Sequence, residues 1–247
     1  MLAFSSLLGN VEGQNIYRIW YDKPASYWEE ALPVGNGRIA AMVFGDPQLE
    51  QIQLNEETVS AGSPYQNYNE EAKTALPEMR RLIFEGKYEE AQNMAATKIL
   101  SQVGNEMPYQ TVGRLNIRYQ DHKKVNNYYR DLDISNAVAV TRYEVDGVEF
   151  TEETFASFTD QLVIRHIKAS KPGTINCELF FNTPMRDPKR SIYGKKGLRL
   201  EGITHGSRYF PGKVHYCADL DVKHKGGKVI TANDTLLSVQ GASELTL

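Results

Sequence analysis

Several features that mark particular classes of protein are scarce or missing in this chain of 247 residues. It has two cysteines, no Cys-x-x-Cys pair and five scattered histidines, so we expect no metal site and no cofactor. The formal net charge is −3 with both signs mixed along the chain, which gives no long-range attraction for nucleic acid. No apolar run is long enough to span a membrane.

The first residues leave two interpretations open. Residues 1–9 are apolar but lack a positively charged start, so they are either the remnant of a secretory signal or a disordered leader. We assign residues 1–15 to this leader. Because no low-complexity linker divides the remainder, we expect residues 16–247 to form one domain.

Two-residue alternation of apolar and polar side chains dominates the chain. Residues 38–44 and 49–55 predict a hairpin around the Gly45-Asp46-Pro47 turn, and Asp146-Gly147 between residues 138–145 and 148–155 is typical of a type I′ hairpin. About ten or more such segments predict a mainly β protein with two packed antiparallel sheets. Cys177 and Cys217 lie in two of these segments, which favours buried, unpaired thiols; a disulfide between neighbouring strands is the alternative.

One stretch has a different period. Residues 69–101 place apolar side chains at helical spacing in two segments, separated by Glu85-Gly86-Lys87. Pro77 lies inside the first segment, so that helix either starts near it or bends there. We expect a two-helix insertion that caps one edge or end of a sheet.

Residues 28–64 carry a recognisable pattern. Trp28 is followed by Ala31-Leu32-Pro33 and by Gly35-Asn36-Gly37-Arg38, and the second strand continues as Leu54-Asn55-Glu56. This block, with further matches at residues 109–115, 129–133 and 143–155, resembles the N-terminal part of glycoside hydrolase family 95, the α-L-fucosidases and related α-L-galactosidases. Two letters differ, because Ala40 replaces a glycine and Ser60 replaces a tryptophan. The second change removes a flat side chain of the kind on which sugar rings stack.

The resemblance implies a β-super-sandwich, followed in the family by a helical linker and an (α/α)₆ barrel. Family members are inverting enzymes whose catalytic glutamate, aspartate and assisting asparagines belong to that barrel. This sequence agrees with the first module alone, so we assign no catalytic residue and expect the chain by itself to be inactive. The resemblance favours sugar contact through five residues, each of which also has a structural explanation in a turn or against the core: Trp28, Asn36, Arg38, Asn55 and Glu56.

We therefore interpret the chain as the N-terminal, non-catalytic domain of a hydrolase of fucosylated or galactosylated glycans. In that role it supports the absent catalytic domain, and an exposed docking face makes self-association possible. The alternatives are a free-standing carbohydrate-binding module with a stacking surface, or a scaffold domain. The residues proposed for that surface are Tyr109, Tyr128, Tyr129, Tyr209 and Phe210. The leader and the habit of the resembling enzymes suggest a periplasmic or extracellular location.

Overall fold

The computed structural model describes residues 17–62, 66–101, 107–207 and 210–247. The expected leader, residues 1–15, lies outside them. The described strands form three antiparallel sheets. The first sheet, in spatial order, contains β1 (Arg18–Tyr21), β6 (Val125–Asp133), β7 (Val138–Val145), β8 (Val148–Ser157), β9 (Leu162–Ala169), β17 (Glu244–Thr246) and β14 (Lys223–Lys225).

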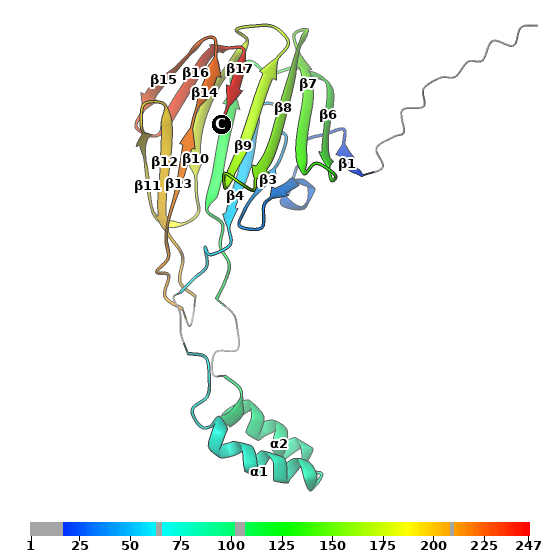
Figure 1. Ribbon diagram of the computed structural model, residues 1–247, viewed down its shortest axis with the longest axis vertical. Coiled ribbons are helices and arrows are strands. Elements are labelled where there is room, and N and C mark those ends of the chain that lie inside the picture. Colours follow the sequence, from blue (N-terminus) through cyan, green and yellow to red (C-terminus); the bar gives the residue numbers. More distant parts are fainter. Residues whose placement is uncertain (1–16, 63–65, 102–106, 208–209) are drawn as a thin grey trace, which may run out of the picture.

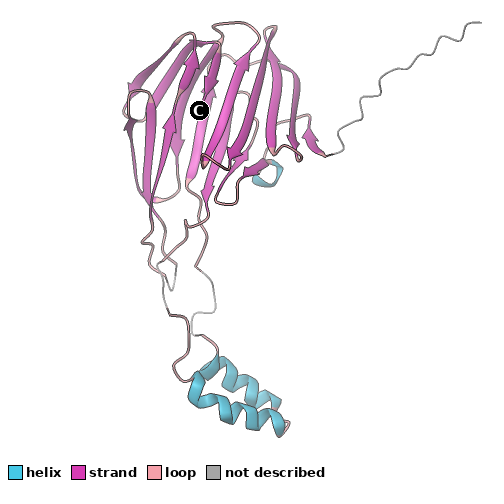
Figure 2. Ribbon diagram, viewed as in Figure 1, coloured by secondary structure: helices cyan, strands magenta, loops and turns pink. Residues whose placement is uncertain are grey.

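The second sheet faces the first. It contains β15 (Lys228–Asn233), β16 (Leu236–Ala242), β10 (Ile175–Asn182), β5 (Gly113–Tyr119), β4 (Leu49–Glu56), β3 (Ile39–Val43) and β2 (Leu32–Gly35). The third sheet has β11 (Arg186–Tyr193), β12 (Gly197–Ile203) and β13 (His215–Asp221). The predicted mainly β, antiparallel sandwich is therefore confirmed (Figure 2).

Alternation along the strands builds the core. Ile117 and Leu179 of the second sheet and Ile167 and Leu245 of the first are fully buried and belong to one hydrophobic cluster. Leu200 of the third sheet belongs to the same cluster, so all three sheets share a single core. The burial of these side chains supplies the main stabilisation of the sandwich.

Turn chemistry fixes the predicted hairpins. Asp146 and Gly147 have φ of 49° and 76°, the left-handed values that a type I′ turn requires, and they join β7 to β8. Gly45 has φ of 74° between β3 and β4. A Cβ atom at Gly45 would lie 2.7 Å from the hydroxyl oxygen of Tyr128, so both the backbone and the space require glycine there.

The helical insertion is confirmed, but its predicted position is wrong. α1 (Ala72–Phe84) and α2 (Tyr88–Met94) pack through Ala75, Leu82 and Ala91, and one π-helical turn, η2 (Ala95–Ile99), follows. α1 begins five residues before Pro77 and continues through it. The pair lies beyond one end of the sandwich and covers no edge of the described strands (Figure 1). Neither helix is long and apolar enough to cross a membrane.

The two thiols differ in environment. Both cysteines are free. Cys177 on β10 is buried as predicted, whereas Cys217 on β13 is exposed, so the prediction of burial was wrong there. Cys217 points away from the core because β13 turns Leu220 inward, and alternation then turns the odd-numbered residues outward.

Candidate functional site

Three of the five predicted sugar-binding residues lie together at one end of the sandwich. The turn between β2 and β3 carries Asn36 and Arg38, and Glu56 ends β4 beside them. The Asn36 Oδ1 accepts hydrogen bonds from the Arg38 and Ile39 backbone amides at 3.1 and 3.0 Å. The Arg38 Nε donates to the Glu56 Oε1 at 3.2 Å. Asn36 also donates through Nδ2 to the Ser157 carbonyl at 2.8 Å, which ties this turn to the first sheet.

The Glu56 carboxylate is held as an anion. Partial burial would raise its pKa, but hydrogen bonds from the Thr58 hydroxyl at 2.5 Å and the Thr58 amide at 2.8 Å, together with Arg38, outweigh burial and lower it. A carboxyl group with a lowered pKa is a poor proton donor at neutral pH. Glu56 is therefore unsuited to act as a general acid at neutral pH.

The cluster also has an exposed aromatic neighbour. Ser60 and Tyr109 form an isolated antiparallel bridge just beyond β4. The Tyr109 side chain is exposed, and burial together with the nearby Glu56 and Glu57 carboxylates raises its pKa. The Arg38 side chain is 58% exposed. A guanidinium group and an aromatic ring thus face solvent around the anchored carboxylate.

Of the other two predicted residues, Trp28 lies apart from this cluster, whereas Asn55 directly precedes Glu56 on β4. Trp28 opens the short 3₁₀ helix η1 (Trp28–Glu30) ahead of β2, at the end of the β2–β3 hairpin opposite Asn36. It is 47% exposed. Asn55 pairs with Ala40 on β3, and its buried Oδ1 has no hydrogen-bond partner among the described residues.

The aromatic residues named for a stacking surface are also divided. Of the four that the structure describes, Phe210 is buried, and Tyr128 donates its hydroxyl to the Gly45 carbonyl at 2.7 Å inside the sandwich. Tyr129 stacks on Trp20 of the edge strand β1, with ring centroids 6.3 Å apart. Tyr209 lies outside the described residues. Of the four described residues, Tyr109 alone has an exposed side chain.

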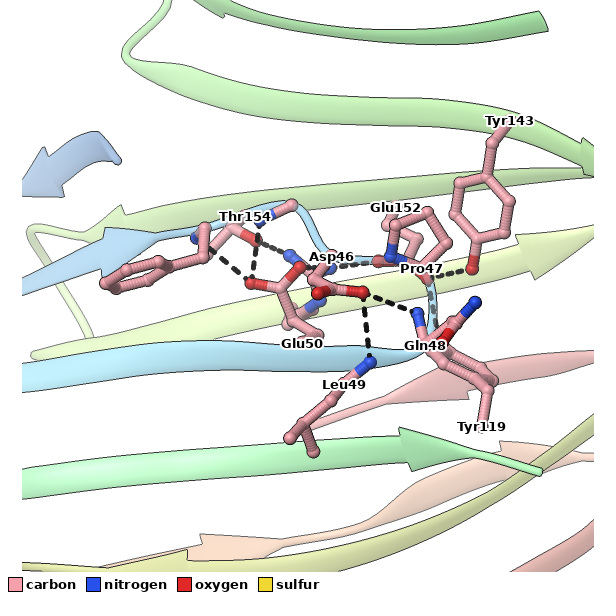
Figure 3. Close-up of polar contacts among 12 residues, drawn as sticks. Asp46, Pro47, Gln48, Leu49, Glu50, Tyr119, Tyr143, Glu152 and Thr154 are labelled. Carbon is pink, nitrogen blue, oxygen red and sulfur yellow. Dashed lines mark hydrogen bonds and ion pairs between the residues drawn. The ribbon is translucent and has the colours of Figure 1, made fainter. Parts of the chain in front are cut away.

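A second group of polar residues, which sequence reasoning missed, lies in the core between the two large sheets (Figure 3). The Arg165 guanidinium on β9 forms ion pairs with Glu152 on β8 and with Glu50 on β4, the latter at 3.3 Å. It also donates to the Thr154 hydroxyl at 2.7 Å. All three charged side chains are at most 2% exposed.

The Oε1 atom of each carboxyl group accepts two further hydrogen bonds. The Glu152 Oε1 accepts from the Tyr119 and Tyr143 hydroxyls at 2.6 and 2.7 Å. The Glu50 Oε1 accepts from the Phe44 and Gly45 amides, both at 3.1 Å. Because β4 and β5 belong to the second sheet and β7 to β9 to the first, this network fastens one sheet to the other.

Burial sets the protonation of Glu50. Loss of solvent raises the pKa of its carboxyl to about 7; Arg165 opposes that rise and the Glu152 carboxylate adds to it. A carboxyl group with such a pKa often marks an active site. Here no solvent reaches Glu50, so a substrate has no access to it, and its role is structural.

A signal for this network exists in the sequence. Glu50 has the same parity as Ile52 and therefore shares its face of β4. Glu152 shares a face with Phe150, and Arg165 shares one with Ile167. When charged residues of opposite sign on different strands each share a strand face with core residues, the pattern indicates a buried ion pair.

Comparison with known proteins decides the family. The model for the family described as "Glycosyl hydrolase family 65, N-terminal domain" matches residues 19–247, which is nearly all of the described chain. The chain belongs to this family. The predicted glycoside hydrolase N-terminal domain is thus confirmed, although the number 95 is not confirmed, since the matching family carries the number 65.

Curated relatives give the same picture. The chain is 37% identical over 181 residues to "Alpha-L-fucosidase 2" of Arabidopsis thaliana, covering 71% of this chain and 21% of that protein. It is 26% and 25% identical to proteins named "Probable alpha-fucosidase A" from Aspergillus niger and Aspergillus oryzae, covering 62% and 80% of this chain and 20% and 28% of those proteins. The matched part of the chain therefore spans 20–28% of the length of these relatives.

Proposed function

We propose that this domain supports the catalytic domain of an α-L-fucosidase or related hydrolase and has no hydrolytic activity of its own. The observation that carries the proposal is the family match over residues 19–247 in a chain that spans only 21–28% of these α-fucosidase relatives. The paired carboxyl groups of the core, Glu50 and Glu152, are engaged by Arg165 and closed to solvent. They are therefore unsuited to the acid and base roles of a glycosidase.

We further propose that the end of the sandwich bearing Asn36, Arg38 and Glu56 contributes a loop to the rim of the sugar-binding cleft of the intact enzyme. The exposed Arg38 guanidinium offers several hydrogen-bond donors to sugar hydroxyls, and Glu56 holds it in place at 3.2 Å. The leader favours export, so we place the intact enzyme in the periplasm or outside the cell.

The test compares the intact hydrolase with the 247-residue chain, using an aryl α-L-fucoside as substrate. We expect turnover from the intact enzyme and none from the chain alone. A failure of the intact enzyme to hydrolyse the aryl α-L-fucoside or the matching α-L-galactoside would refute the proposed activity.

Arg38→Ala in the intact enzyme tests the loop. We expect KM for the fucoside to rise several-fold with little change in kcat, because a rim contact binds the ground state and the transition state alike. Lys189→Ala on β11 serves as a matched control. Lys189 is exposed, and its substitution removes a cation elsewhere on the sandwich. Equal kinetic constants for the two variants would exclude the loop from the cleft.

A further inference from the structure

A slot separates two strands at the border between the first and third sheets. Its volume is about 550 Å³. Residues 161–165, at the start of β9, line one side of the slot. Residues 217–221 of β13 line the other side. Ile52, Leu115 and Phe181 of the second sheet line its inner side. The slot therefore opens onto the hydrophobic core of the sandwich.

On both sides of the slot, the strand has an edge that pairs with no other described strand. The first residues of β9, Leu162 to Ile164, pair with β8 on one side and with no described strand on the other. β13 pairs with β12 alone among the described strands. Free backbone donors and acceptors on facing edges are a template for one further strand.

The short strand β17 already runs toward this slot (Figure 1). It lies between β9 and β14, pairing Thr246 with His166 on one side and with Lys223 on the other. Leu247 continues the β9 pairing, because it exchanges two backbone hydrogen bonds with Arg165 at 2.9 and 3.0 Å. Since β14 follows β13 after one residue, an extension of β17 would enter the space between the two free edges.

We propose that the slot is filled by an extended strand, and that this strand is the segment of the intact hydrolase that follows Leu247. The inference rests on the proposed function, because the occupant comes from the remainder of the longer enzyme. In this arrangement the first and third sheets become continuous opposite the second sheet. The pairing register already present in β17 favours this occupant over a strand from a second copy.

Side-chain alternation specifies the chemistry of the strand. Leu245 is fully buried and Leu247 lines the slot, so every second residue of the occupant faces the core. These positions are expected to be apolar, because Val163 on one side and Leu220 on the other line the slot. The intervening residues face solvent alongside Leu162 and Asp219.

A cross-strand disulfide tests the register in the intact hydrolase. The pairing of Leu247 with Arg165 places the third residue after Leu247 opposite Leu162, with both side chains on the outer face. Leu162→Cys, combined with a cysteine at that third position, is expected to form an intramolecular disulfide, detected as a linked peptide by mass spectrometry. A cysteine at the second position, which faces inward, is the matched control and should not form it.

Hydrogen exchange gives a second readout without any substitution. Antiparallel pairing alternates, so Val163, like Arg165, directs its amide toward the slot. We expect this amide to exchange about tenfold or more slowly in the intact enzyme than in the 247-residue chain. The amide of Ile164, which points toward β8, should change less.

Three results would overturn the inference: equal exchange at Val163 in the two proteins, no disulfide at the third position, or a disulfide that joins two copies of the chain. The fucoside assay on the same intact protein separates this inference from the proposed function. An active enzyme without the disulfide refutes the strand alone, whereas an inactive protein with the disulfide refutes the hydrolase activity alone.

Discussion

Glu152→Gln is the most informative change to the sandwich. The substitution keeps the size of the side chain and removes its negative charge. The Glu152 carboxylate accepts hydrogen bonds from Tyr119, Tyr143 and Arg165, all of them donors. A glutamine must direct its NH₂ group either at Arg165, which cannot accept, or at the tyrosine hydroxyls, which must then accept instead of donating, so the present hydrogen bonds cannot all be kept.

The magnitude follows from the burial. Breaking a buried ion pair costs about 3–5 kcal/mol, because the remaining charge stays in the core without a partner. Arg165 retains Glu50 at 3.3 Å, which places the expected loss at the lower end, about 3 kcal/mol. For a domain of this length, that corresponds to a fall in Tm of about 6–12 °C.

Urea and thermal unfolding, followed by circular dichroism, measure this loss. Glu149→Gln is the matched control, because Glu149 lies on the same strand with its side chain exposed to solvent; we expect it to change stability by less than about 0.5 kcal/mol. If the two variants unfold within about 0.5 kcal/mol of each other, the buried network does not fasten the sheets together.

The same network predicts a pH dependence. The folded protein keeps a proton on Glu50 up to pH about 7, whereas the unfolded chain releases it near the ordinary value of 4.5. Folded protein therefore binds more protons in this window, and Glu50 makes the free energy of unfolding fall by up to about 3 kcal/mol as the pH rises from about 4.5 to 7. His122 contributes in the opposite direction, because burial lowers its pKa. Glu152→Gln removes the repulsion on Glu50, so the fall should be smaller in that variant.

Two further predictions concern single positions. Gly45→Ala should cost at least about 2 kcal/mol more than Gly86→Ala, because the two glycines have similar φ of 74° and 76° but only Gly45 lacks space for a Cβ atom; equal Tm values for these variants would contradict the crowding. Ellman's reagent should titrate one thiol in the native chain, Cys217, and a second, Cys177, only in denaturant. Two rapidly reacting thiols in the native chain would contradict the burial of Cys177, and no reactive thiol in denaturant would contradict the free state of both cysteines.

Local pattern was enough to predict much of the fold. Asp146-Gly147 specified its hairpin because few residues adopt left-handed φ at both turn positions, and alternation along residues 49–55 specified the second strand of the opening hairpin. Helical spacing gave the insertion but not its place, because the path of its connecting segments depends on long-range packing. The cysteine on β13 shows the same limit: alternation defines two faces, and only the assembled sheets decide which one is buried.

The candidate site was predicted less completely. Asn36, Arg38 and Glu56 meet because antiparallel pairing brings a turn beside a strand end, which the hairpin pattern implies. Trp28 lies at the far end of that hairpin, since the four residues of β2 separate it from the turn that carries Asn36. To predict the Glu50 network, the phases of three strands from both sheets, β4, β8 and β9, must be combined, because each strand considered separately assigns its charges to solvent.

The most direct measurement is the rate of aryl α-L-fucoside hydrolysis by the purified 247-residue chain beside the intact enzyme. We expect turnover only from the intact enzyme, while cooperative unfolding of the isolated chain shows that it is folded. Turnover by the folded 247-residue chain, above that of a heat-inactivated sample, would contradict its assignment as a non-catalytic N-terminal domain.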